Sequence, residues 1–281
     1  FPAAMESGVE WARATGLPVR KVTGVVLANE LFDAIPVHRV TVRGGRLREL
    51  RVGVGHDGEL TDVASNPVPG IAERLAQLEV DLSEGHIAEV CLEAERWLSD
   101  LGAAMTSGYL LMIDYGHEAK AYYDVSRNRG TLRTYYRHTL GMNPYLNVGR
   151  QDISVHVEFT SVREAARVAG FRDVGVTTQT EFLRNLGFDS YHRAVESLAD
   201  LRTEAKIANV QAMDSLLDQG GMGGFKVMAF TKGLPPVNLT GFAGGRSPES
   251  VPALLAGAFH MPLPGLGRRR PDIPTWDELL R

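Results

Sequence analysis

The sequence lacks several features that mark familiar classes of protein. Among its 281 residues there is one cysteine, Cys91, which cannot form an intrachain disulfide and indicates a reducing compartment. The longest apolar runs, such as residues 110–113, are far shorter than the roughly 20 residues that a membrane helix needs. No signal-peptide pattern is found. We therefore expect a soluble chain with no membrane span.

An excess of charge of one sign is also lacking. The 30 basic and 34 acidic residues nearly balance, so the sequence gives no reason to expect binding to nucleic acid. The histidines and the cysteine have no metal-ligand spacing, and we expect no metal site. No G-x-S-x-G turn of a hydrolase is present, and the glycines at 220–224 lack the Lys-Ser/Thr of a phosphate-binding loop.

What is present is the pattern of an open α/β sheet. Apolar strands are predicted at residues 24–28, 109–114, 173–178 and 226–231, and helices at 88–105 and 161–169. Helix, apolar strand and polar loop follow one another, which is typical of a sheet with a mainly parallel core. With 44% apolar residues the chain can bury the core of one large domain, which we place at 1–233.

Two insertions and a tail interrupt this pattern. Residues 37–54 alternate apolar and polar side chains around Gly44-Gly45, which predicts an antiparallel hairpin within an insertion at 37–84 that ends in a loop with a short helix. A charged helical insertion is expected at 186–222. The segment 234–281 holds eight of the 14 prolines and is predicted to be an irregular extension with a short helix at 276–280.

Polar residues follow the first two predicted strands. Asn29, Glu30 and Asp33 come after the first, and Asp114 and His117 end the second. In open α/β sheets ligands bind beyond the carboxyl ends of the strands, so these residues are candidates for a site. Each also has an ordinary structural explanation, because Asn29 could cap the following helical turn and His117 could be a surface-loop histidine.

The residues after the first strand carry a family resemblance. Residues 26–37 read VLANELFDAIPV and resemble the signature of MidA-like class I S-adenosylmethionine-dependent methyltransferases. Further matches occur in the same order along the chain. They are IDYGH at 113–117, GTLR at 130–133, RH at 137–138, DISVHVEFT at 152–160, TQ at 178–179 and FKV at 225–227.

The resemblance implies a seven-stranded Rossmann-like sheet, represented here from its fourth strand onward, with S-adenosylmethionine as the cofactor. It assigns Ala28 and Asn29 to the cofactor side. The first strand of such a sheet and its glycine-rich loop have no counterpart in the sequence, so we expect this chain alone to bind the cofactor weakly and to be inactive. The family includes a mitochondrial complex I assembly factor that dimethylates an arginine of a partner subunit.

By this resemblance, the intact protein is expected to methylate an arginine of a partner protein, which in this family can be a respiratory complex subunit. We expect it in the cytoplasm if bacterial and in the mitochondrial matrix if eukaryotic. A carboxylate can hold a guanidinium through two N–H groups and keep one nitrogen free to attack. Glu30 is the candidate for this role. The supporting candidates are Asn29 and Asp33 as positioners, and Asp114, His117 and His156 for orienting the substrate or accepting its proton.

Two other functions stay open. The chain could be a non-catalytic assembly or binding protein that keeps the methyltransferase scaffold and uses its insertions to hold a partner. It could also be a nicotinamide-dependent oxidoreductase, although no dinucleotide-binding fingerprint is found. The methyl acceptor and the oligomeric state cannot be inferred from the fold.

Overall fold

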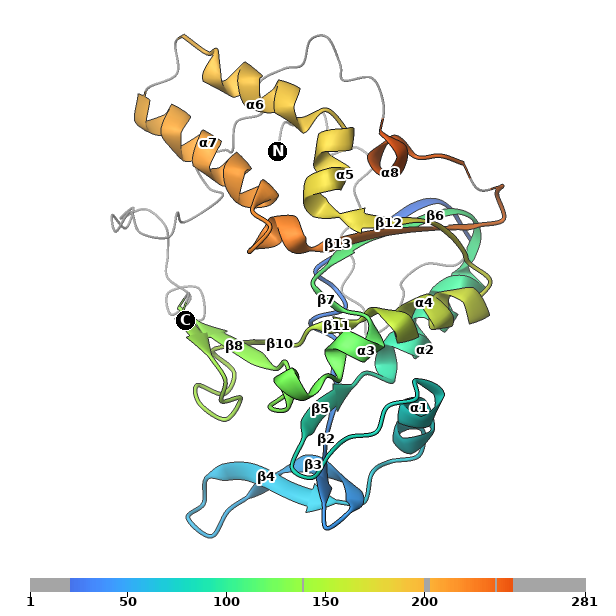
Figure 1. The fold of residues 1–281 in the computed structure, drawn as a ribbon, viewed down its shortest axis with the longest axis vertical. Coiled ribbons are helices and arrows are strands. Elements are labelled where there is room, and N and C mark those ends of the chain that lie inside the picture. Colours follow the sequence, from blue (N-terminus) through green and yellow to red (C-terminus); the bar gives the residue numbers. More distant parts are fainter. Residues whose placement is uncertain (1–20, 138, 200–202, 236, 245–281) are drawn as a thin grey trace.

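The computed structural model describes residues 21–137, 139–199, 203–235 and 237–244 (Figure 1). Its main sheet has four strands in the order β1-β6-β13-β12, with bounds Val22–Asn29, Met105–Asp114, Lys226–Lys232 and Arg172–Thr178. All four predicted strands lie in this sheet. The predicted α/β fold and the common sheet are therefore confirmed.

One strand departs in direction from the predicted mainly parallel core. The strands β1, β6 and β12 run in the same direction, whereas β13 is antiparallel to both β6 and β12. The prediction therefore holds for three of the four strands of this sheet and is wrong for β13. The reason is the path between β12 and β13, which leaves and re-enters at the same end of the sheet. There the Gln179 amide donates to the Phe225 carbonyl at 2.8 Å, so β13 must run back alongside β12.

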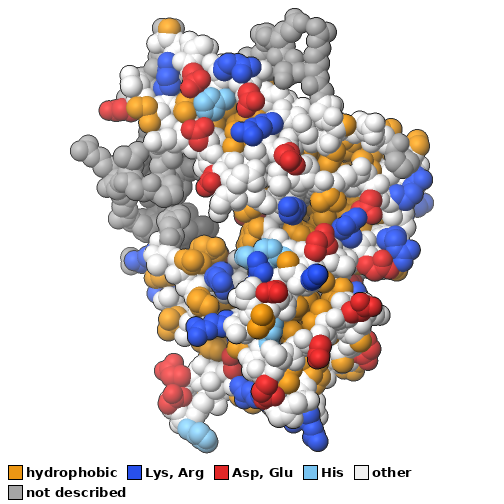
Figure 2. Space-filling view, in the orientation of Figure 1, with side chains coloured by type: hydrophobic (Ala, Val, Ile, Leu, Met, Phe, Trp, Pro, Cys, Tyr) orange, Lys and Arg blue, Asp and Glu red, His pale blue; other side chains and the backbone are white. Residues whose placement is uncertain are grey.

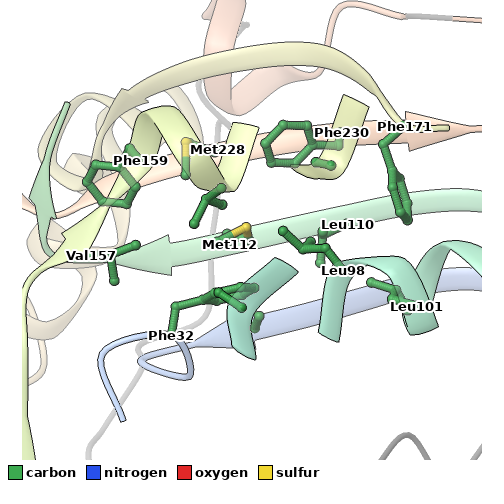
Figure 3. Packing of buried hydrophobic residues seen from close by; sticks show 14 of the residues in the cluster. Phe32, Leu98, Leu101, Leu110, Met112, Val157, Phe159, Phe171, Met228 and Phe230 are labelled. Carbon is green, nitrogen blue, oxygen red and sulfur yellow. The ribbon is translucent and has the colours of Figure 1, made fainter. Parts of the chain in front are cut away.

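The main core lies between one face of this sheet and the helices α2 (Glu93–Ala104) and α4 (Phe159–Val168). Leu98 and Leu101 of α2 are three residues apart on one helical face, and both are fully buried. Figure 3 shows them against Leu110 and Met112 of β6. Replacing such a leucine by alanine typically costs about 2–5 kcal/mol, so this packing fixes α2 and β6 relative to each other.

The other face of β1 is open. Val25 is 67% exposed and Leu27 is 62% exposed, although both belong to the apolar run that forms the strand. The strand also ends the sheet order, and no other described strand pairs with its outer edge. Exposed edges of this kind favour pairing with further chain, so β1 is an open edge of the described sheet.

A second, antiparallel sheet contains the predicted hairpin. Its order is β4-β3-β2-β5, with bounds Leu60–Ser65, Arg46–Val54, His38–Arg43 and Ile87–Val90, and α1 (Ile71–Gln77) packs beside it. Gly44 and Gly45 both have positive φ, as the predicted two-residue turn requires. The helix expected from residue 88 begins only at 93. Residues 87–90 pair with β2 instead, because strand pairing outweighs a local spacing that also suits a helix.

The remaining elements lie between the two sheets or follow β12 (Figure 1). Near the carboxyl end of β6 lie β7 (Gly116–His117), α3 (Ala119–Tyr122), the three strands β8 (Arg133–Tyr136), β9 (Thr139–Gly141) and β10 (Asp152–Ser154), and β11 (Val157–Glu158). After β12 come α5 (Gln179–Asn185), α6 (Phe188–Glu196), α7 (Thr203–Leu217) and α8 (Thr240–Ala243).

The helices α6 and α7 form a pair at one end of the molecule, opposite the second sheet (Figure 1). They account for most of the expected helical insertion. The helix predicted at 276–280 lies outside the described residues. Among the described helices, none combines the length and the apolar character needed to cross a bilayer.

Candidate functional site

The carboxyl ends of β1 and β6 lie side by side, because Asn29 is in register with Ile113 in a parallel pair. The Glu30 amide donates to the Ile113 carbonyl at 2.9 Å, which extends this pairing one residue past β1. Glu30 has a φ of 45°, a left-handed conformation that is costly for any residue other than glycine. Such strain is concentrated at functional sites, and here it leaves an exposed carboxylate at the sheet edge.

The charge of Glu30 responds to its surroundings. Partial burial raises its pKa, the nearby Asp33 carboxylate raises it further, and a side-chain hydrogen bond from Asn29 lowers it. Asn29 therefore contacts the candidate carboxylate itself. The alternative explanation, that Asn29 caps a helix, is wrong, because residues 31–35 form a turn and not a helix. The Ala28 side chain is buried in the main core, so only its backbone reaches the sheet edge.

Asp114 ends β6 and is 1% exposed. Its Oδ2 accepts hydrogen bonds from the amides of Phe32 at 3.0 Å and Asp33 at 3.4 Å, and its Oδ1 accepts from the Tyr115 amide at 3.0 Å. Burial and the Asp33 charge raise the pKa of Asp114 to about 7, although these amides act in the opposite direction. Asp114 therefore holds the turn that carries Asp33.

Tyr115 joins the two groups of predicted residues, although the sequence did not single it out. Its hydroxyl donates to Asp33 Oδ2 at 2.5 Å and lies 2.8 Å from Ser154 Oγ. Its ring meets the His156 ring edge to face, with centroids 5.5 Å apart. The sequence does contain a signal for Tyr115. It is a polar aromatic residue directly after an apolar strand, at the same sheet edge as Asp114.

His117 and His156 form a hydrogen-bonded pair, with His117 Nε2 and His156 Nδ1 3.2 Å apart. The parallel pairing of β7 with β11 brings them together, and it requires Gly116, where a Cβ would lie 2.0 Å from the Val157 carbonyl oxygen. Burial lowers the pKa of His156 to about 4, aided by His117 and Arg133. Both imidazoles are thus neutral near pH 7, and a neutral imidazole can accept a proton.

Basic side chains surround the histidine pair. Burial lowers the pKa of His117 first, followed by the charges of Arg127 and Lys226. In the space-filling view, histidine and basic side chains gather near the middle of the face, where β7 and β11 lie (Figure 2). The site thus has an acidic part at the end of β1 and a basic part around β7. Tyr115 spans the two, through Asp33 on one side and His156 on the other.

Two kinds of ligand site that the sequence analysis considered are not found among the described residues. No group of three metal-ligand side chains occurs in the part of the chain that the structure describes. Within the same residues, no strand leads through a glycine-rich turn into a helix. The glycines at 220–224 precede β13 and lie partly in a short 3-10 helix.

A parallel strand pair with polar side chains gathered at its carboxyl end defines the class, an α/β protein with the arrangement at which open α/β sheets bind their ligands. Comparison with known families is specific. Residues 3–177 match the family described as "Putative S-adenosyl-L-methionine-dependent methyltransferase". This match covers more than half of the chain, and the chain belongs to that family. The predicted family and its cofactor, S-adenosylmethionine, are confirmed.

Curated relatives are mitochondrial proteins. The protein arginine methyltransferase NDUFAF7 of Danio rerio is 29% identical over 225 residues, which are 74% of this chain and 49% of the relative. The Homo sapiens protein of the same name is 27% identical over 202 residues, covering 70% of this chain and 42% of the relative. The chain thus spans about half the length of the curated relatives that it matches.

A crystal structure of a related protein from Burkholderia thailandensis, bound to S-adenosyl-homocysteine, has a similar fold. The sequence identity is 32% and the TM-score is 0.72, over 83% of this chain and 59% of that chain. A second structure from the same organism, without this ligand in its name, gives the same identity and TM-score and is covered to 61%.

Proposed function

We propose that the protein is an S-adenosylmethionine-dependent arginine N-methyltransferase that acts on a partner protein, and that the described residues form its acceptor side. The observation that carries this proposal is Glu30, an exposed carboxylate held in a strained backbone at the carboxyl end of a parallel strand. The proposal also draws on the names of the curated relatives, which are protein arginine methyltransferases.

S-adenosylmethionine supplies a methyl group on a positively charged sulfur, which leaves as a neutral thioether. The task of the protein is to hold one guanidinium nitrogen in line with that methyl group. Glu30 can accept two N–H groups of the guanidinium in fork geometry and draw the positive charge away from the attacking nitrogen. Asn29 keeps the Glu30 carboxylate oriented through its side-chain hydrogen bond, and Asp33 adds negative charge beside it.

Methylation forms a carbon–nitrogen bond, breaks a carbon–sulfur bond and releases one proton from the acceptor nitrogen. We assign the acceptance of this proton to His117, which is neutral near pH 7, whereas a pKa of about 4 makes His156 a weak base that orients His117 through their hydrogen bond. Tyr115 keeps the pair beside the acidic residues, because its hydroxyl is held by Asp33 and its ring packs on His156. Asp114 contributes through the turn that it fixes.

The test is Glu30→Gln in the full-length protein. The exchange keeps the shape of the side chain and removes its charge, so losing a charge-assisted bidentate contact should cost about 2–4 kcal/mol of transition-state stabilisation, or roughly 30- to 1000-fold in rate. Transfer of labelled methyl from S-adenosylmethionine to protein acceptors in a cell extract is measured at saturating cofactor. Glu59→Gln, at an exposed glutamate between β3 and β4, is the matched control. Equal rates for Glu30→Gln and the control would remove Glu30 from the mechanism.

A second function remains a candidate on a specific observation. The described residues contain no glycine-rich turn between a strand and a helix, which suits a non-catalytic binding protein on a methyltransferase scaffold. For the 281-residue chain itself we expect only weak binding of S-adenosylmethionine, because that turn supplies backbone donors to the cofactor. Isothermal titration calorimetry measures this directly. A dissociation constant of about 1 μM or tighter would mean that another part of the chain holds the cofactor.

Partner and location follow from the same proposal. A protein substrate is expected because the curated relatives are named protein arginine methyltransferases. A respiratory complex subunit is the candidate that the family resemblance implies. The relatives' names place them in mitochondria, so we propose the mitochondrial matrix for a eukaryotic source and the cytoplasm for a bacterial one. Fractionation of cells that express a tagged full-length protein would test this.

A further inference from the structure

A buried glutamate in the second sheet has no role in the site described so far. Glu89 lies in β5, is 2% exposed and points to the face of the strand opposite Ala88 and Val90, which belong to the second core. Burial raises its pKa, because removing a carboxylate from water disfavours the charged form. The described ion pairs do not include Glu89, and the nearby Arg39 pairs with Asp62 at 2.8 Å. An apolar side chain would suit this position better unless the carboxylate does something else.

The carboxylate holds the loop that precedes β8. Its Oε2 accepts hydrogen bonds from the Thr131 amide at 2.8 Å and from the Thr131 hydroxyl at 3.1 Å. Gly130, with a φ of +74°, lies so close that a Cβ there would be 2.2 Å from Glu89 Oε1. The loop is therefore pressed against the carboxylate, and only glycine fits at the point of closest approach.

The Thr131 hydroxyl connects Glu89 to the candidate site. A hydroxyl has one proton and two acceptor positions. Since its proton goes to Glu89, the oxygen is free to accept from the His156 amide at 3.1 Å and from the Tyr122 hydroxyl at 3.2 Å. Glu89 and His156 also line the same internal cavity, of about 30 Å³. A chain of hydrogen bonds thus runs from the second sheet to the backbone of the histidine that pairs with His117.

We propose that Glu89 is a positioning residue for the His117–His156 pair, acting through the Thr131 hydroxyl on the His156 backbone. The imidazole of His156 must keep its Nδ1 within hydrogen-bond distance of His117, and β11 has only two residues to fix that geometry. Glu89 provides the additional restraint from another sheet. The link to catalysis rests on the proposed function, whereas the link to the geometry of the histidine pair does not.

The decisive variants differ by single groups. Thr131→Val keeps the shape of the side chain and removes the hydroxyl, whereas Thr131→Ser keeps the hydroxyl. Tyr122→Phe removes the other hydroxyl that contacts Thr131 and leaves the chain from Glu89 to His156 complete. The first readout is the ring-nitrogen NMR shifts of both histidines, followed against pH in the 281-residue chain. We expect Thr131→Val to move the titration of His156 toward the ordinary histidine range. Thr131→Ser and Tyr122→Phe should keep the original shifts.

The second readout is kinetic and uses the full-length protein. There Thr131→Val should lower kcat by about 10- to 100-fold with little change in KM, as expected when a reacting group is misplaced by a fraction of an ångström. Glu89→Gln should have a smaller effect in the same direction, because an amide oxygen can still accept from Thr131. A folded Thr131→Val protein with unchanged histidine shifts would overturn the proposal. Changed shifts with unchanged kcat would keep the positioning role and count against the proton-accepting role of His117.

Discussion

The two neighbouring strands β1 and β6 run in the same direction and end in acidic residues that do different things. Glu30 follows β1, is exposed and has a left-handed backbone. Asp114 ends β6, is buried and accepts hydrogen bonds from three backbone amides. The local sequences look alike, since each is an apolar run followed by an acid. One acid is available to a ligand, and the other supports the turn beside it.

The largest effect on stability is expected at Asp114. At pH 6, Asp114→Ala should lower the free energy of unfolding by about 2–4 kcal/mol, because it leaves buried amides without an acceptor. Glu30→Ala should lower it by less than about 1 kcal/mol, since its side chain is exposed. Urea unfolding followed by circular dichroism measures both. Similar losses of stability for the two variants would contradict the view that Asp114 supports the fold and Glu30 does not.

The dependence of stability on pH should also separate the two acids. The folded-state pKa of Asp114 is about 7, above the ordinary 3.8, so the folded state keeps a proton that the unfolded chain releases. This contribution is complete below about pH 4 and is lost as the pH rises toward 7. Between about pH 5 and pH 8 the natural protein should lose roughly 1–3 kcal/mol relative to Asp114→Asn.

His156 affects the pH dependence of stability in the opposite direction, and this effect cancels when the natural protein is compared with Asp114→Asn. The folded-state pKa of His156 is about 4, below the ordinary 6.5, so its neutral burial makes the fold more stable as the pH rises through that range. Parallel stability curves for the natural protein and Asp114→Asn would show that Asp114 has an ordinary pKa.

The smallest expected change concerns backbone strain. Glycine adopts a positive φ without steric cost, so Glu30→Gly should change the free energy of unfolding by no more than about 1 kcal/mol while removing methyl transfer. Glu79 is a matched control, because it is also an exposed glutamate with a positive φ, of 54°. Glu79→Gly should have a similar effect on stability and none on transfer. Loss of transfer in both variants would point to a general defect.

The sequence predicted the parts of the fold that depend on local pattern. The four strands of the main sheet, the turn at Gly44-Gly45 and helix α4 follow from apolar periodicity and glycine placement. The strand β5 was missed because its four residues also suit the start of a helix. They form a strand because they pair with the edge of β2, and this pairing is not visible in the local sequence. The antiparallel direction of β13 depends on a chain path that no local pattern encodes.

In the candidate site, too, some residues could be predicted from the local sequence and others depend on long-range contacts. Asn29, Glu30 and Asp114 could be found because they end or directly follow apolar strands. The contact of Tyr115 with Asp33 joins residues 82 positions apart, and that of Thr131 with His156 joins residues 25 positions apart. Such contacts exist only once the two sheets are in place. The residues that position the site are therefore harder to predict from the sequence than those that would contact a ligand.

The place of β13 between β6 and β12 also sets the order in which the protein can fold. Thr231 of β13 donates to the Gly108 carbonyl across 123 residues of chain. During synthesis β6 and β12 emerge from the ribosome before the strand that pairs with both of them. Contacts of such long sequence separation slow folding, because the chain between them must be confined first. We expect the main sheet to close only after Lys232 has been made, and nascent chains that stop before Lys226 to remain sensitive to protease.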